Sequence, residues 1–184
     1  MILRQCAGYI AEEMSVNEAP GWHSFEAYFK PSLRQDRAHT GDIFELEDGL
    51  WIILSPQCDM ANKKIATVIL AACANDAVQD WTSARDNYAS VDDGKKKKGA
   101  DAIRGFIGQN KLKPSNHFLP PFGANHHPLI VDFGNVKIVA MNDVDAILKQ
   151  RIASLSPALI PNLTQRFGAW ISRTGQPDFD PGHV

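Results

Sequence analysis

The central part of the chain is a series of short apolar runs separated by polar, turn-forming segments. Residues 42–46 have the composition of a strand, and the pair Asp48-Gly49 that follows is typical of a tight turn. The next run, residues 50–55, is almost wholly apolar, which predicts a strand buried on both faces. A second such run covers residues 66–73, after a polar segment over residues 56–64. The two runs predict neighbouring strands at the centre of a small sheet, joined by a loop.

Further strands are expected in the second half of the chain. Three prolines within residues 111–122 limit that segment to a short edge strand around residues 116–119. The apolar runs 129–133 and 136–141 flank the dipeptide Gly134-Asn135. Two strands around such a dipeptide predict a tight hairpin.

Two helices are predicted after this hairpin. Asn142 or Asp143 is suited to cap the first, whose apolar positions recur at helical spacing up to Leu155. The second helix has Ser156-Pro157 as its starting pair, or begins at Pro161. Strands followed by helices are typical of an α+β domain, so we predict a small, largely antiparallel sheet with C-terminal helices.

The remaining segments divide the chain. Residues 1–39 mix aromatic and polar positions without a sustained period, and we expect them to pack on the domain as a short helix plus a strand. Residues 75–110 read as an insertion, in which the run Lys95–Lys98 predicts a mobile surface loop. We therefore predict an extension over residues 1–39, a domain over residues 40–175 with this insertion, and an irregular tail over residues 176–184.

Composition narrows the class of protein. The chain has 184 residues and a net charge of −2, which suits one domain and excludes a global attraction to polyanions. Its three cysteines lack metal-type spacing and are expected to be reduced thiols. Glu12 and Glu13 stand where a secretion signal needs an apolar run, and no stretch is apolar for about 20 residues. These features predict a soluble, cytoplasmic protein without a membrane partner.

In their order along the chain, the segments resemble toxins of the MazF/PemK family. Gly41-Asp42 precedes an apolar strand, Asn62-Lys63 lies in the polar segment, and residues 67–72 (TVILAA) match the family's next strand. A short mid-chain strand, a closing hairpin and helices follow in the family's order. The resemblance covers roughly residues 40–74 and 111–172.

The resemblance implies a curled, barrel-like sheet, a homodimer and metal-independent cleavage of single-stranded RNA. The family's site pairs an arginine before the first buried strand with a Thr or Ser after the second. Those positions hold Gly49 or Leu50 and Ala74 here, and Thr40 stands where the family often has a basic residue. The resemblance therefore implies the fold and the RNA partner, whereas the groups that would cleave RNA differ.

Three residues are candidates for catalytic groups. Cys58 and Asp59 lie near the place of the family's site. They are candidates for a thiol nucleophile and an acid–base group. The alternative is that Asp59 caps a turn and Cys58 is only its neighbour. His117, on the mid-chain strand, is the candidate general base. His117, His126 and His127 could join Asp59 in a metal or acid–base cluster, but successive strand residues such as His126 and His127 point to opposite faces, so no metal site is predicted. No cofactor motif is present in the sequence.

Basic residues of the insertion and the segment after it are candidates for RNA contact. Tyr88 and Phe106 are candidates for stacking on bases. The alternative for these cations is a solvated surface loop, and Arg151, Arg166 and Arg173 are either contacts to a partner or solvated surface charges. The candidate RNA-binding residues are Lys95, Lys96, Lys97, Lys98, Lys111 and Lys113.

Three functions remain open. The first is a divergent MazF/PemK-like RNA-binding protein or endoribonuclease, which a basic groove lined by Asp59 and His117 would favour. The second is a non-catalytic adaptor or regulator of a bacterial stress or defence system, with an antitoxin-like or regulatory protein as its partner. A flat apolar patch in the same region would favour it. The third is an unrelated α+β domain.

Overall fold

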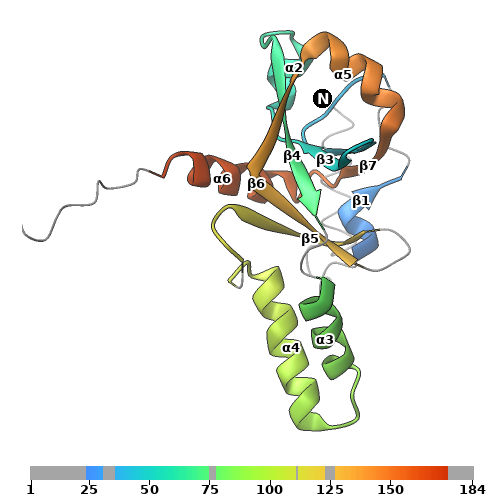
Figure 1. Ribbon diagram of the computed structural model, residues 1–184, viewed down its shortest axis with the longest axis vertical. Helices are drawn as coiled ribbons and strands as arrows, with labels where there is room; N and C mark the ends of the chain where they lie inside the picture. The colour runs from blue at the N-terminus through green and yellow to red at the C-terminus, as the bar shows by residue number, and fades with distance from the viewer. Residues whose placement is uncertain (1–23, 31–35, 75–77, 111, 123–126, 174–184) are drawn as a thin grey trace, which may run out of the picture.

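The computed structural model describes residues 24–30, 36–74, 78–110, 112–122 and 127–173 (Figure 1). The helices are η2 (Ser24–Ala27), α2 (Gln57–Ala61), α3 (Val78–Tyr88), α4 (Asp93–Ile107), α5 (Met141–Ile147), η3 (Leu148–Gln150) and α6 (Ile160–Ile171). The strands are β1 (Tyr28–Phe29), β2 (Asp42–Leu46), β3 (Gly49–Ile53), β4 (Thr67–Ala74), β5 (Asn116–Phe122), β6 (His127–Ala140) and β7 (Arg151–Leu155).

These strands form one curled antiparallel sheet in the order β1-β7-β2-β3-β4-β6-β5. The predicted α+β class, with a small antiparallel sheet and a C-terminal helix, is confirmed. The predicted central pair is also confirmed, because Ile52 of β3 lies opposite Ala71 of β4. The turn between β2 and β3 is one residue earlier than expected: Leu46 pairs with Gly49, whose φ of +122° suits glycine.

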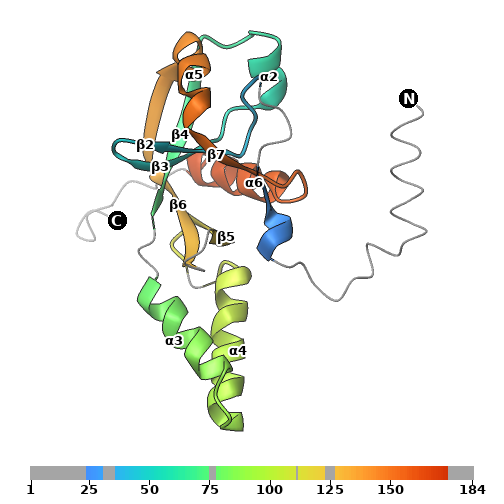
Figure 2. The same cartoon turned by 90° about the vertical axis from the view of Figure 1, so that its right-hand side faces the viewer.

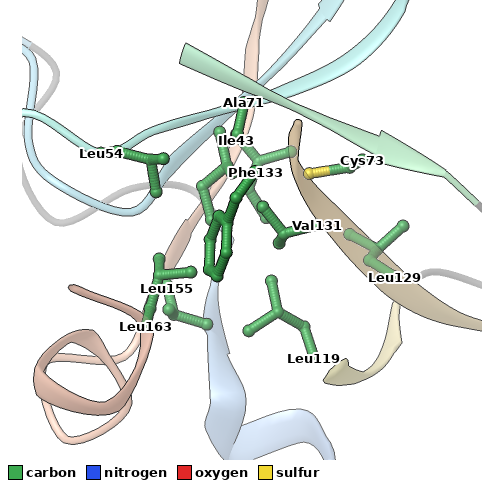
Figure 3. Packing of buried hydrophobic residues seen from close by; sticks show 11 residues of the cluster. Ile43, Leu54, Ala71, Cys73, Leu119, Leu129, Val131, Phe133, Leu155 and Leu163 are labelled. Carbon is green, nitrogen blue, oxygen red and sulfur yellow. The ribbon is translucent and has the colours of Figure 1, made fainter. Parts of the chain in front are cut away.

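Both faces of the sheet are covered. On one face, Phe133 lies at the centre of a buried cluster that includes Ile43, Val131 and Leu163 (Figure 3). On the other face, Phe44, Trp51 and Met60 belong to a second cluster, to which α5 contributes Val144. Successive residues of β3 alternate between the clusters, as Trp51 and Ile52 do. The prediction that this strand is buried on both faces is therefore confirmed.

The predicted hairpin around Gly134-Asn135 is wrong. Strand β6 continues through this dipeptide, and β4 pairs with the residues on both sides of it. Ala71 lies opposite Val136, whereas Ala72 lies opposite Asp132, so the residues between form a bulge. Two features keep the chain extended here. Both halves of β6 pair with β4, and the bulge directs Phe133 into the core.

The first predicted C-terminal helix is too long. The helix α5 ends at Ile147, and residues 151–155 form strand β7 between β1 and β2. Backbone pairing with two strands outweighs the helical spacing of these apolar residues, because Ala153 and Leu155 are buried in the sheet. The second helix begins at Ile160 with Pro161 in its first turn, which confirms Pro161 as the better of the two predicted starts.

The Gly41-Asp42 pair fixes β2 against β7. Gly41 has a φ of +85°, and a Cβ there would lie 2.9 Å from Leu155 Cβ, so a larger residue is excluded. Asp42 is fully buried; its Oδ2 accepts hydrogen bonds from Arg151 Nη1 and the His39 backbone N–H, each at 2.7 Å. Its Oδ1 accepts from Ser154 Oγ. Arg151, expected on a solvated face, is thus part of a buried ion pair.

Helices α3 and α4 pair as a hairpin that extends away from the end of the sheet (Figures 1 and 2). This pair is called the arm below. No helix in the ranges given above is long and apolar enough to cross a membrane.

Candidate functional site

The candidates Cys58 and Asp59 lie on a short helix rather than in the predicted loop. Both belong to α2, where the Cys58 thiol lies 3.5 Å from Asp59 Oδ1. The Cys58 carbonyl oxygen accepts a hydrogen bond from Asn62 Nδ2, which closes the helix. Cys58 is exposed. Helix α2 lies beside α5, at the end of the molecule opposite the arm (Figures 1 and 2).

His117 lies elsewhere, on β5 near the base of the arm (Figure 1). Its side chain is only 2% exposed and stacks on Phe133, with 6.2 Å between ring centroids. Burial, and then the positive charge of Arg166, lower the pKa of His117 to about 4. A neutral imidazole enclosed in the core has no route to a substrate, so this geometry does not suit a general base.

The predicted groove lined by both Asp59 and His117 is not formed. Helix α2 lies at the end of the molecule away from the arm, whereas β5 lies where the arm meets the sheet (Figures 1 and 2). His127 lies opposite Phe122, at the other end of β5 from His117, and His126 is outside the described residues. Among the residues that are described, no group of three or more His, Cys, Asp or Glu is placed to hold a metal ion.

The positions that the family resemblance assigns to catalysis do lie side by side. Gly49 begins β3 and Ala74 ends β4, next to the paired residues Leu50 and Cys73. Cys73 lies there with a thiol, but burial raises the pKa of this thiol to about 12. A thiol with that pKa carries almost no thiolate at neutral pH and is a poor nucleophile.

The lysine run is helical, which corrects the predicted mobile loop. Lys95, Lys96, Lys97 and Lys98 occupy the first turns of α4, with their side chains in solvent. Asp92 caps this helix by accepting a hydrogen bond from the Lys95 backbone N–H at 2.7 Å. Lysine is a good helix former, and later turns of α4 pack on α3, so the segment has both local and tertiary reasons to be helical.

A groove of about 750 Å³ runs along the arm to the edge of the sheet. One stripe of α3 and one stripe of α4 form its two walls, and the apolar side chains of Phe106 and Ile130 form its floor. Lys98 and Lys113 both line it, so the structure brings together two of the six candidate RNA-binding lysines. Lys111 lies outside the described residues. The other lining residues are Asp80, Ser83, Ala84, Asn87, Ala102, Leu112 and Asn116.

The stacking candidates differ in their surroundings. Phe106 is buried against Trp81 and Phe118, with ring centroids 5.7 and 6.1 Å away. Tyr88 is exposed at the far end of α3. Phe106 therefore forms part of the floor of the groove and packs the arm against the sheet, and it is not an exposed stacking surface.

Gln109 holds the arm against the sheet edge. Its side-chain Oε1 accepts from the Phe118 backbone N–H at 2.7 Å, and its Nε2 donates to the Phe118 carbonyl at 3.1 Å. The amide thus occupies the outer edge of β5 as a neighbouring strand would. Together with the Trp81–Phe106–Phe118 contacts, it fixes the angle at which the groove meets the sheet.

Gly99 sets the distance between the two helices of the arm. A Cβ at this position would lie 2.3 Å from the Tyr88 backbone N and 2.7 Å from the Ala84 carbonyl oxygen. We expect Gly99→Ala to force α3 and α4 apart and to destabilise the arm by about 1–3 kcal/mol. Hydrogen exchange of the amides of residues 78–107 measures this directly.

The control for this substitution is Gly94→Ala, in the first turn of the same helix. A Cβ there meets only the Asp92 carboxylate, at 3.2 Å, so exchange in the arm should stay as in the wild type or slow down. Equal exchange rates for the two variants would contradict the close contact at Gly99.

A second cavity, of about 420 Å³, lies between α2, α5 and the segment before β2. Arg37 and Lys63 line it together with Asp36 and Asp145, so two acids offset two cations. Its electrostatics therefore favour a polyanion less than those of the arm groove do.

Sequence reasoning missed the polar residues of the groove that surround its lysines. Asp80, Ser83 and Asn87 recur at helical spacing on α3, as Lys98, Ala102 and Phe106 do on α4. If the lysine run is interpreted as a capped helix, the helical spacing places Lys98, Ala102 and Phe106 on one face. Against known proteins, the chain matches no family model, no curated protein and no solved structure.

Proposed function

We propose that this protein binds single-stranded RNA along the groove between the arm and the sheet, on a MazF/PemK-like scaffold. The observation that carries the proposal is the position of the two lysines. Lys98 lies two helical turns along α4 from Phe106, and Lys113 lies beside the sheet. Eight helical residues span about 12 Å, so the groove is a linear channel with a cation toward each end.

A linear channel of this kind suits a segment of a polymer better than a compact metabolite. Lysines separated along it can each neutralise one phosphate of an extended strand. The amide and hydroxyl groups of Asn87 and Ser83 line the wall between them, where they can donate to or accept from sugars and bases. The exposed Lys95, Lys96 and Lys97 on the same helix add a positive field that attracts a polyanion to the arm.

The curled antiparallel sheet is compatible with a MazF/PemK-like scaffold, and Gly49 and Ala74, the positions of the family's catalytic pair, flank the paired residues Leu50 and Cys73. Neither residue has a side chain that donates to a phosphate or accepts a proton. Asp59 and His117 lie too far apart to replace them. We therefore propose binding rather than cleavage, and the homodimer and the cytoplasmic location implied earlier stay predictions.

Charge reversal in the groove tests the proposal. We expect Lys98→Glu/Lys113→Glu to weaken binding of a fluorescently labelled single-stranded RNA at least tenfold, because two phosphate contacts become repulsive. Fluorescence anisotropy titrations at several salt concentrations measure the affinity and its salt dependence. The slope of log K against log[salt] should become shallower by about 1.4, at about 0.7 per phosphate on a single strand.

Lys64→Glu/Lys149→Glu is the matched control, because both lysines are exposed, lie outside the groove lining, and together make the same change in net charge as the groove variant. It should leave both the affinity and the salt slope close to those of the wild type. Equal losses for the control and the groove variant would show non-specific electrostatic binding, and a wild type without affinity for RNA would reject the proposal.

A second candidate is the non-catalytic protein-interaction module. It is favoured by the exposure of Val136 and Ile138, which are 43% and 68% exposed on one face of β6. Their strand segment pairs with β4, whereas β5 pairs with β6 only as far as Asp132. If the wild type has no affinity for RNA, this apolar strand segment becomes the first place to look for a protein partner.

A further inference from the structure

The second half of β6 forms an open edge of the sheet. Strand β5 pairs with β6 from His127 to Asp132, whereas β4 pairs with β6 as far as Ala140. Beyond Asp132, no described strand lies on the side of β6 that faces away from β4 (Figure 1). We propose that residues 136–140 pair antiparallel with the same residues of a second copy of this chain. Such pairing does not depend on the proposed RNA binding.

The hydrogen bonds of β4 show which backbone groups of β6 face the open side. The Ile69 carbonyl oxygen of β4 points to β3, where it accepts from the Leu54 N–H at 2.9 Å. Opposite residues of an antiparallel pair direct their backbone groups either toward each other or both away. Ile138 lies opposite Ile69 and therefore directs its N–H and C=O away from β4, as do Val136 and Ala140. These three residues present donors and acceptors in one line along the open edge.

The adjoining edge of the sheet, along β5, is closed by side chains. Gln109 occupies its middle, as described above. To either side, the Asn116 carbonyl oxygen accepts from Arg166 Nη2 at 3.1 Å, and the Pro120 carbonyl oxygen accepts from the Tyr28 hydroxyl at 2.7 Å. Such contacts, and a proline without an N–H, prevent another strand from pairing. Residues 136–140 contain no proline, and no described side chain bonds to their outward backbone groups in this way.

The open edge is complementary to itself. A two-fold axis that places Ile138 opposite Ile138 of the second copy also places Val136 of each copy opposite Ala140 of the other. All the outward backbone groups of these residues then exchange hydrogen bonds. Their side chains share one face of the sheet, so apolar groups meet apolar groups across the junction. Val136 and Ile138, now 43% and 68% exposed, would thereby gain cross-strand neighbours.

On the other face, the one charged residue of the segment already has a partner. Lys137 Nζ lies 2.5 Å from Asp48 Oδ2 and 4.2 Å from the centroid of the Trp51 ring. In the two-fold pairing, Lys137 lies opposite Val139 of the second copy, not opposite another lysine. Two copies therefore pair without setting like charges against each other. A second copy needs no foreign side chain to satisfy this edge, which identifies it as the occupant.

Charge substitutions at position 138 test the pairing, because this residue would lie opposite itself. Ile138→Lys and Ile138→Glu should each weaken self-association by about tenfold or more, since like charges replace an apolar pair. An equimolar mixture of the two variants should restore dimers, because a positive side chain then lies opposite a negative one. Sedimentation velocity at a series of protein concentrations, without RNA, measures the dimer fraction. Restored dimers would also show that both variants remain folded.

Ile107→Lys is the matched control, because Ile107 is an exposed isoleucine at the end of α4 and is not part of the sheet. It should leave self-association as in the wild type. A wild type that stays monomeric at about 0.1 mM would overturn the pairing, as would equal losses in Ile107→Lys and Ile138→Lys. A mixture that stays monomeric would overturn the register at Ile138. RNA affinity is measured separately, so none of these results decides the proposed function.

Discussion

Arg151→Met is expected to lower the free energy of unfolding by about 3–5 kcal/mol, the cost of leaving a buried charge without its partner. Asp42 is 0% exposed and the Arg151 side chain 4%, so water cannot replace the lost guanidinium. Arg151 also donates to the Arg37 carbonyl at 2.8 Å, which ties the segment before β2 to β7. Urea unfolding followed by circular dichroism gives the free energy of unfolding. An unchanged dependence of this free energy on urea concentration would show that the variant exposes the same surface on unfolding as the wild type.

Two companion variants show whether the loss comes from the unpaired carboxylate. Asp42→Asn/Arg151→Met removes both charges but keeps an oxygen that can accept from Ser154 Oγ, so it should recover much of the stability. Arg104→Met removes the arginine of an exposed pair, Arg104–Asp101 at 3.1 Å, and should change stability little. A loss in Arg151→Met no larger than in Arg104→Met would contradict a structural role for the buried pair.

The Asp42–Arg151 ion pair illustrates which features of the fold local sequence patterns do not predict. Patterns within a run predicted β2, β3 and β4, because alternation and apolar length are properties of neighbouring residues. The strand β7 was predicted as a helix, because its identity depends on Asp42, which precedes Arg151 by 109 residues. An arginine that looks like a surface charge in the sequence becomes the buried partner of an aspartate only after the sheet has formed.

The bulge in β6 has a similar origin. Gly134-Asn135 is a good hairpin dipeptide, and nothing local favours an extended chain over a turn. The preference comes from β4, which pairs with β6 on both sides of the bulge, and from Phe133, which fills the core between Val131 and Leu163. Partners that are distant in the sequence decided the outcome.

The residues of the candidate site also differ in whether local sequence could predict them. Lys98 and Lys113 were identified as phosphate contacts from charge alone, and the structure places both on one groove. Asp80 and Asn116 carry no local signal, because their place in the lining of one groove depends on how the arm meets β5. The family resemblance placed Asp59 and His117 near one site, but Asp59 lies on α2, after the central strand β3, and His117 lies within the edge strand β5. Charge can be read from composition, whereas a hydrogen-bonding pattern requires the fold.

His117 provides the second large effect, a loss of stability in acid. In the folded protein its pKa is lowered to about 4, first by burial and then by Arg166, against an ordinary value of 6.5. The unfolded chain therefore binds a proton before the folded protein does as the pH falls. Stability should decrease from about pH 6.5 to pH 4 by about 3 kcal/mol in total, and this contribution should then level off.

The variants His117→Phe and His117→Leu isolate this contribution. Neither variant has a titratable ring at position 117. Subtracting the pH dependence of a variant's stability from that of the wild type therefore removes the contribution of the carboxylates, which all three proteins share. The readout is the slope of that difference between pH 7 and 4, not the absolute stability, because the replacements also change packing against Phe133. Parallel profiles would contradict the buried, neutral imidazole and would reopen His117 as an acid–base group. A difference that grows toward pH 4 would establish that His117 is neutral and enclosed at pH 7.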